Sequence, residues 1–303
     1  MSSLGLSGSS GSSAGTSSTG ISLQGTKDFL QSNSLVAKFA FLMLILILFV
    51  MVLRWGVALL NYIFSPSGNP HMLDGMIDSK HMKVIPQDPS KDGAKPILRS
   101  NNQRDGIEFT WSCWIYIDDL DYGAGTYRHI FHKGNDDINY TQAPTGLNKP
   151  NNGPGLYITP NKNNLLLIMN TFDKIEEKIV IEDVPLNKWI NVIIRCENTT
   201  VDCYINGTIT KRHNLSGVPF QNYGNVYMSM NGGFSGYTSN LWYWDYGLGT
   251  SHIQSIVDQG PNMTMADSGM SESEPRYFSL RWFFANTGSV SYTHLTLPTK
   301  RIV

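Results

Sequence analysis

A continuous apolar run near the N-terminus limits what this chain can become. The segment FAFLMLILILFVMVL, Phe39 to Leu53, carries no polar side-chain atom except methionine sulfur. At 1.5 Å per residue this segment spans roughly 22 Å, which is short of a hydrocarbon core of about 30 Å. Apolar residues continue beyond Arg54, so a longer helix crosses the bilayer if the Arg54 guanidinium extends to the nearer headgroups. We therefore predict a transmembrane helix over residues 39–60, with the lipid bilayer as a partner.

Charged residues on either side of the run bear on its orientation. Lys27 and Lys38 lie on the N-terminal side, whereas Lys80 and Lys83 lie farther away on the other side. Because cytoplasmic flanks carry an excess of Lys and Arg, we expect a single-pass protein of type II, with its C-terminal domain outside the cytosol. A buried core helix is less favoured, since every face of the run is apolar. A cleaved signal peptide is also less favoured, since the run is longer than a usual signal and starts far from the first residue.

The regions around the run differ in composition. Residues 1–38 begin with a stretch in which 14 of the first 20 residues are Ser or Gly, and we expect a disordered tail there. Residues 65–103 are rich in Pro, Gly, Asp and Lys, which predicts a stalk. Residues 289–303 closely resemble a peptide translated from sequencing-adapter DNA, and we interpret them as an artefactual tail. The formal net charge of −1 argues against a nucleic-acid partner.

Residues 104–260 consist mostly of short runs with a period of two. IEFTWSCWIYI, from Ile107 to Ile117, is the clearest of about ten such runs, and clusters of Asn, Gly, Pro and Asp separate them. No run of helical length and period occurs among them until Thr250, where TSHIQSIVDQGP predicts one short helix capped by that residue. Many strands without intervening helices predict an all-β fold, an antiparallel sandwich or barrel.

One segment carries a family resemblance. NKWINVIIRCENTTVDCYINGTITKRHNL resembles the Trp–strand–turn–strand–Tyr-x-Asn-Gly signature of laminin G-like, concanavalin A-like jelly rolls, through Trp189, Tyr204, Asn206 and Gly207. FTWSCWIYI looks like the family's early strand, and NLWYWDYGLGTSHIQSIVDQGP looks like its closing strand and helix. The resemblance implies an antiparallel jelly-roll sandwich over residues 104–260. The whole layout also resembles single-pass proteins of large DNA viruses.

Aromatic residues are the candidate ligand contacts. In NLWYWDYGL, the family-like register turns Leu241 and Tyr243 toward the core and the alternate residues outward. Large rings on one strand face form an apolar platform that suits a sugar ring or a partner protein. The alternative is that residues 261–288 pack on the sandwich and cover this face with the segment PRYFSLRWFF. The candidate ligand-binding residues are Trp242, Trp244, Tyr246, Trp114 and Tyr116.

Metal binding rests on the family resemblance. Members of this family often bind Ca²⁺ at the rim of the sandwich through loop carboxylates, so Ca²⁺ is the candidate cofactor. Asp118, Asp119 and Asp121 share one acidic loop and are the candidate ligands, although solvated loop carboxylates are the alternative interpretation. His129 and His132 are three residues apart in a strand and are expected on opposite faces, which argues against zinc.

Two cysteines leave two alternatives open. Cys196 and Cys203 are expected on the inward faces of neighbouring strands. If the turn pairs these two residues with each other, they come within disulfide reach, with Cα atoms about 4.4–6.8 Å apart. If the turn is two residues tighter, Cys203 pairs with Ile194 and both thiols stay buried and reduced.

Catalysis is not expected. Related enzymes that hydrolyse β-glucans place two carboxylates on one strand face, about 5 Å apart. Here Glu176–Glu177 and Glu182–Asp183 are adjacent in sequence, so the members of each pair point to opposite faces. The predicted function is therefore a non-catalytic membrane protein that displays a domain for binding a glycan or a protein surface. The alternatives are a structural envelope or virion membrane protein and, less favoured, a membrane-tethered glycoside hydrolase.

Overall fold

The structure is a computed structural model that describes residues 34–100, 102–103, 106–141 and 143–266. The chain divides into two compact units, Met1–Ser65 and Pro66–Val303. Most of the predicted disordered tail and the whole of residues 289–303 lie outside the described residues.

The first unit contains the helix α2, Leu35–Phe64. Ser34 caps its N-terminus, because the Ser34 hydroxyl accepts a hydrogen bond from the Ala37 amide at 3.2 Å. This cap starts the helix four residues before the predicted Phe39. Thirty residues give a length of about 45 Å, and nearly every apolar side chain on the helix is exposed. The helix is therefore long and apolar enough to cross a membrane.

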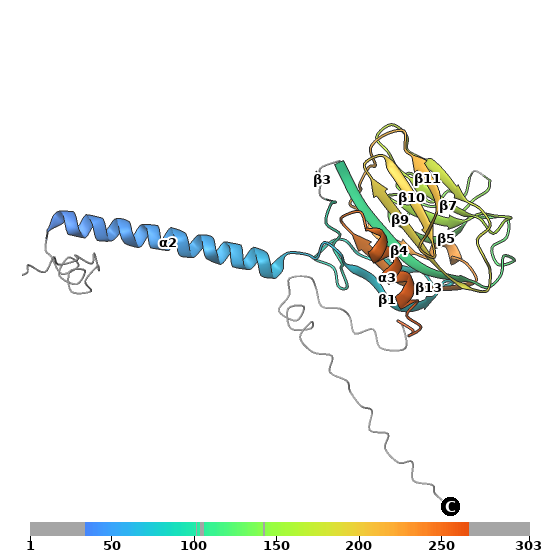
Figure 1. Ribbon diagram of the computed structural model, residues 1–303, viewed down its shortest axis with the longest axis horizontal. Coiled ribbons are helices and arrows are strands. Elements are labelled where there is room, and N and C mark those ends of the chain that lie inside the picture. The colour runs from blue at the N-terminus through green and yellow to red at the C-terminus, as the bar shows by residue number, and fades with distance from the viewer. Residues whose placement is uncertain (1–33, 101, 104–105, 142, 267–303) are drawn as a thin grey trace, which may run out of the picture. The chain divides into compact units, whose positions relative to one another are not determined.

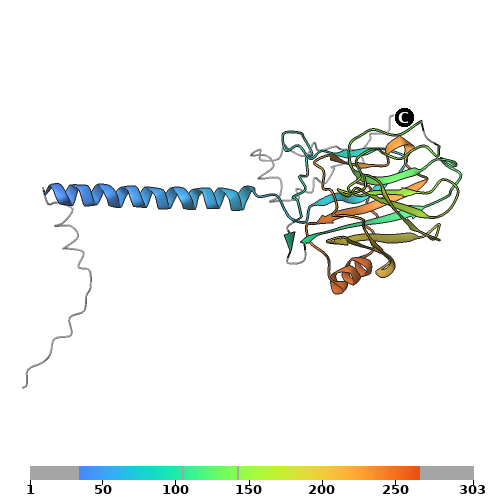
Figure 2. The same cartoon turned by 90° about the horizontal axis from the view of Figure 1, so that it is seen from above.

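The second unit is a sandwich of two antiparallel sheets (Figures 1 and 2). The larger sheet has the order β1-β13-β4-β9-β10-β11, with β3 paired to β4, and the smaller has the order β2-β12-β5-β6-β7-β8. The all-β sandwich predicted from the alternating pattern is confirmed. The larger sheet comprises β1 His71–Asp78, β3 Asn102–Gln103, β4 Gly106–Ile117, β9 Trp189–Glu197, β10 Thr200–Ile205, β11 Thr208–Asn214 and β13 Gly236–Trp244. The smaller comprises β2 Lys83–Ile85, β5 Arg128–Gly134, β6 Gly155–Ile158, β7 Leu165–Met169, β8 Glu177–Ile181 and β12 Asn225–Met228.

The main core lies between the inward faces of the two sheets. Trp111 of β4 is 1% exposed and sits near its centre. Its ring contacts Phe131 of the opposite sheet, with centroids 5.4 Å apart, and Tyr243 of β13, with centroids 5.0 Å apart. Leu241 belongs to the same core, so the predicted inward side of β13 is confirmed.

The predicted stalk over residues 65–103 is wrong where β1 and β2 occur. β1 pairs with β13 and β2 pairs with β12, so each adds a strand to its sheet. The register of β1 shifts between Leu73 and Met76 around Gly75, which has φ +88°. A Cβ atom at Gly75 would lie 2.6 Å from the Thr264 carbonyl oxygen, so glycine is required there. This bulge breaks the period of two and conceals the strand in the sequence.

The start of the C-terminal segment packs on β1. The Met76 amide donates to the Thr264 carbonyl at 2.7 Å, and the Ala266 amide donates to the Met76 carbonyl at 2.8 Å. These contacts confirm packing on the sandwich for the first residues of 261–288 only. PRYFSLRWFF lies outside the described residues.

The Tyr-x-Asn-Gly signature forms the tight turn between β10 and β11. Asn206 and Gly207 have φ of 49° and 78°, as a two-residue hairpin turn requires. Asn206 also accepts a hydrogen bond from the Asn191 amide at 2.8 Å, which ties the turn to β9. Tyr204 packs on the outer face of the sheet in a second, smaller core beneath the helix α3, Thr250–Gln259. The signature is thus explained by turn geometry and packing. The helix was predicted correctly, but its N-cap is Gly249 and not Thr250.

Of the two alternatives for Cys196 and Cys203, the structure excludes the candidate disulfide and confirms the tighter turn with free thiols. β9 and β10 are joined by the two-residue turn Asn198-Thr199, and Asn198 has φ 53°. This tighter turn places Cys203 opposite Ile194 and Cys196 opposite Val201. Both thiols are free and buried, and burial raises the pKa of each to about 12.

Candidate functional site

Three of the five predicted ligand-binding residues line one small cavity on the outer face of the larger sheet. We call this cavity of ≈ 210 Å³ the tryptophan notch. Trp114, Trp242 and Trp244 provide its aromatic wall. Its polar lining includes Asn69, Ser112, Asn240, His252 and Gln259.

A β-bulge in β13 positions the central ring of the notch. Ser239 lies opposite Trp114 of β4, but Trp242 lies opposite Ser112, so β13 carries one extra residue in this interval. Asn240, within the bulge, has φ 47°. The bulge returns Trp242 to the outward face while Leu241 still enters the core.

The open aromatic platform predicted from the sequence is not formed. Trp244 is 4% exposed, because α3 covers it through Ile253 in the smaller core. The His71 ring stacks on Trp242 with centroids 3.8 Å apart and an interplanar angle of 10°. Helix α3 therefore covers Trp244, and the partly exposed Trp242 forms a wall of the notch.

The other two predicted residues lie away from the notch. Tyr116 belongs to a ring cluster with Trp189 and Tyr237, at centroid distances of 5.5 and 6.4 Å. Tyr246 is exposed just beyond β13 and does not line the notch. Strand alternation predicts an outward face for all five residues, but the bulge and α3 decide which of them share a cavity.

Two polar side chains lie at or beside the notch. Asn240 lines the notch, and its side chain interacts with the ring of His71, which stacks on Trp242. Burial is the main cause of the lowered pKa of His71, which keeps the ring neutral near pH 7. The notch thus combines indole rings with the side-chain amides of Asn69 and Asn240, a combination that suits hydroxyl groups of a ligand.

The acidic loop after β4 forms a turn. The Asp119 carboxylate accepts hydrogen bonds from the Asp121 and Tyr122 amides at 2.9 and 3.0 Å, and the latter bond is the main cause of its lowered pKa. Asp118, Asp119 and Asp121 are all exposed. Within the described ranges, no three His, Cys, Asp or Glu side chains are grouped to hold a metal ion. Calcium binding by this loop stays a prediction.

His129 and His132 lie on the same face of β5, so their expected placement on opposite faces is wrong. The register of β5 against β6 shifts between His129 and Phe131, and this bulge restores both rings to one side. His129 Nε2 lies 2.6 Å from His132 Nδ1, and both residues are buried.

Two carboxylates are buried among the residues that the structure describes, and both have partners there. Asp202 pairs with Arg212, at 2.6 Å between Oδ1 and Nε, and with Arg195 at 3.5 Å. Glu177 accepts hydrogen bonds from the Ser216 amide and lies 3.1 Å from His213. Both groups therefore hold neighbouring strands and loops together.

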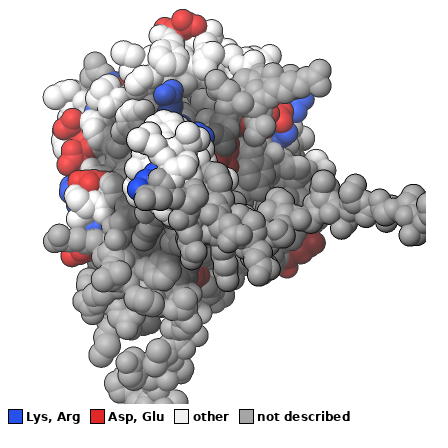
Figure 3. Space-filling model, turned by 90° about the vertical axis from the view of Figure 1, so that its left-hand side faces the viewer, with Lys and Arg blue, Asp and Glu red and all other residues white. Residues whose placement is uncertain are grey.

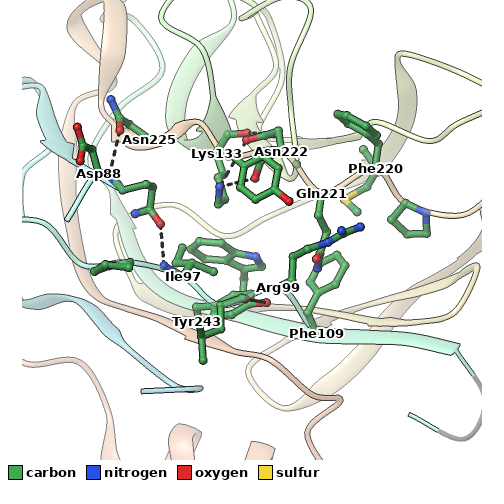
Figure 4. A pocket seen from close by; sticks show the side chains of 18 residues that line it. Asp88, Ile97, Arg99, Phe109, Lys133, Phe220, Gln221, Asn222, Asn225 and Tyr243 are labelled. Carbon is green, nitrogen blue, oxygen red and sulfur yellow. Dashed lines mark hydrogen bonds between the residues drawn. The ribbon is translucent and has the colours of Figure 1, made fainter. Parts of the chain in front are cut away.

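Sequence reasoning missed a larger cavity between the sheets, which we call the inter-sheet cavity. Its volume is ≈ 320 Å³, and Figure 4 shows it from close by. Phe109, Trp111 and Tyr243 line it from the larger sheet, and Lys133 and Met169 line it from the smaller. These residues are far apart in sequence, so no local pattern indicates the cavity. The one local signal is a lysine within the buried strand RHIFHKG.

On the face shown in Figure 3, Lys and Arg side chains are interspersed with Asp and Glu. This mixture accompanies a formal net charge of −1 for the chain.

A laminin G family model, described as the concanavalin A-like lectin/glucanases superfamily, matches residues 92–254. The match covers more than half of the chain. The protein belongs to the concanavalin A-like lectin/glucanases superfamily. The superfamily match starts after β1 and β2, which complete the two sheets from outside it. No curated protein matches the chain.

Several solved structures are similar to the chain. The receptor binding domain of botulinum neurotoxin D is 12% identical with a TM-score of 0.39, over 50% of this chain and 37% of that one. The binding domain of botulinum neurotoxin serotype D is 14% identical with a TM-score of 0.41, over 54% and 39%. The binding domain of botulinum neurotoxin DC in complex with rat synaptotagmin II is 16% identical with a TM-score of 0.38, over 50% and 36%. The chain spans less than two fifths of the length of these proteins.

Proposed function

We propose that α2 anchors the chain in a membrane as a type II protein and that the sandwich recognises a ligand outside the cytosol. The ligand proposed for the tryptophan notch is one sugar unit of a glycan. The domain is proposed to bind this ligand without a chemical reaction.

The observation that carries the glycan proposal is the composition of the notch. A volume of ≈ 210 Å³ suits one sugar ring, and the wall combines Trp242 with amides from Asn69 and Asn240. Aromatic side chains contact the C–H groups of a sugar, while amides exchange hydrogen bonds with its hydroxyl groups. A protein surface needs a broader apolar area, and α3 removes Trp244 from that area.

The test is a glycan array probed with the full-length chain in phosphatidylcholine nanodiscs. We expect binding to a subset of glycans that share one terminal sugar. Trp242→Ala is expected to lower this binding at least tenfold, and Tyr246→Ala is the matched control because its ring is exposed outside the notch. Circular dichroism shows whether each variant is folded.

Two results contradict the glycan proposal. The first is an array on which the folded wild-type chain binds nothing, which leaves a structural membrane role. The second is equal loss of binding in the two variants, which moves the site to the open surface near Tyr246.

The absence of catalysis is tested by incubating the full-length chain with β-glucans and measuring new reducing ends. Because Asp202 and Glu177 are held in internal ion pairs and hydrogen bonds, we expect no release above that of empty nanodiscs. Turnover by the chain contradicts this part of the proposal and revives the membrane-tethered glycoside hydrolase.

A further inference from the structure

The inter-sheet cavity has an apolar interior and two cationic side chains, and its position differs from that of the tryptophan notch. We propose that it binds a small amphipathic anion, with a flat apolar body between the sheets and one carboxylate that faces Lys133, and that Arg99 adds a second positive charge to the lining. The inference does not depend on the proposed glycan site, because the two cavities have no lining residue in common.

The interior walls of the cavity are largely aromatic and buried. Trp111 is 1% exposed and Tyr243 is 2% exposed, and Phe109 and Met169 are also buried. The volume of ≈ 320 Å³ lies at the lower end of the range of about 300–1,000 Å³ that is usual for ligand pockets. A cavity of this volume fits a small molecule and is too small for a folded protein partner.

Lys133 brings a buried cation to the cavity. Its ammonium group donates to the Asn222 carbonyl at 2.7 Å (Figure 4). It also donates to the Gly224 carbonyl at 2.9 Å. The third contact of the ammonium group, with Asn222 Oδ1, is long at 3.5 Å. One N–H of Lys133 therefore makes only a weak hydrogen bond. No ion pair involves Lys133 within the described residues, and burial lowers its pKa to about 8. A carboxylate at this point supplies the missing counter-charge.

Arg99 supplies a second cation from the segment that closes the cavity. The guanidinium is exposed and has no ion pair among the residues that the structure describes. Asp88 also lines the cavity, but its carboxylate accepts a hydrogen bond from the Ser90 amide at 2.9 Å. The lining therefore favours an anion over a cation.

The segment that carries Arg99 is tied across the opening by hydrogen bonds. The Ile97 amide donates to Gln87 Oε1 at 2.8 Å, and Tyr243 donates its hydroxyl proton to the Leu98 carbonyl at 3.2 Å. Phe220 and Tyr223, which are 41% and 80% exposed, line the opposite side of the opening. An amphipathic ligand thus meets aromatic surface before it enters the cavity.

The experiment is equilibrium dialysis of 2-naphthoate against the full-length chain in phosphatidylcholine nanodiscs, with empty nanodiscs as the blank. The neutral 2-naphthamide is the matched probe, because it keeps the flat body and removes the charge. We expect saturable binding of one naphthoate per chain, at least tenfold tighter than binding of naphthamide. Lys133→Met is expected to remove this preference, and Arg99→Gln is expected to reduce it.

Lys91→Met is the control variant, because Lys91 is exposed on the same segment and does not line the cavity. Lys91→Met is expected to bind both probes as the wild type does. If Lys133→Met does not fold, Arg99→Gln still tests the proposal. Equal affinity of the wild type for the two probes overturns the proposal, and so does binding of neither probe. If Lys91→Met and Arg99→Gln lower the preference for naphthoate equally, the proposal is also overturned. The preference then depends on the overall charge of the protein and not on the residues that line the cavity. None of these results changes the glycan array, so the two proposals fail separately.

Discussion

His129 and His132 form a chain of hydrogen bonds inside the smaller sheet. The Met230 amide donates to His129 Nδ1 at 3.0 Å, and His132 Nε2 lies 2.7 Å from the Asn135 carbonyl oxygen. Because His129 Nδ1 is an acceptor, its proton sits on Nε2 and is donated to His132 Nδ1. Each ring is therefore neutral, and burial lowers the pKa of His129 well below 6.5 and that of His132 to about 4.

These shifts predict a loss of stability in mild acid. Between pH 7 and pH 5 the unfolded chain takes up protons at both histidines, whereas the folded chain does not, so the free energy of unfolding falls. We expect a loss of about 2 kcal/mol per histidine, measured by urea unfolding at the two pH values. His132→Asn should remove its own share of about 2 kcal/mol, and exposed His252→Asn should leave the loss unchanged. Equal stability of the wild type at pH 7 and pH 5 contradicts this account.

The three cysteine thiols are expected to react only after the chain unfolds. All are free and buried, and burial raises the pKa of each thiol to about 12. We expect the folded chain to react with none of its thiols at pH 8 and the urea-unfolded chain to react with all three, without any reductant. If only one thiol is titrated after unfolding without reductant, a disulfide exists and the β9–β10 register is wrong.

At the scale of elements, the β10–β11 turn is coupled to α3. A Cβ atom at Gly207 would lie 3.3 Å from Val257 Cγ2, and Gly207 has φ +78°. Gly207→Ala should therefore lower the free energy of unfolding by about 1–2 kcal/mol, through backbone strain and crowding. Gly249→Ala is the control, because nothing lies within 4 Å of its added Cβ and its φ is −73°. An effect on urea unfolding no larger than in that control contradicts the coupling.

Regular alternation made β4, β9 and β10 predictable, and it made the part of β13 that follows its bulge predictable, because these segments present one face to the core. The outcome differed wherever a bulge interrupts that alternation, as at Gly75 in β1 and between His129 and Phe131 in β5. The outward side chains that line the tryptophan notch could be predicted from the alternation. The packing of α3 on Trp244 could not, because it is a contact between separate elements. The inter-sheet cavity depends on side chains from both sheets, such as Trp111 and Lys133, and only the folded chain brings them together.

At the scale of the whole chain, the first strands of the sandwich lie outside the region that matches the superfamily. β1 forms a ladder with β13, and Met72, Leu73 and Ile77 are buried in the main core. A chain that starts at Pro66 should unfold cooperatively, whereas a chain that starts at Pro86 should expose the edge of β13 and aggregate. Size-exclusion chromatography and thermal unfolding compare the two. Equal stability of the shorter chain contradicts the assignment of β1 and β2 to the sandwich.

The central claim is that one apolar helix holds a folded β-sandwich at a membrane, and extraction of vesicles with alkaline carbonate tests it most directly. The full-length chain is expressed with microsomal membranes, washed at pH 11 and centrifuged, and the mass of the product is measured. Because α2 exposes apolar side chains on every side, we expect the chain to remain in the pellet with its first 65 residues intact. A full-length chain in the supernatant, or a shortened product that has lost the helix, contradicts the claim.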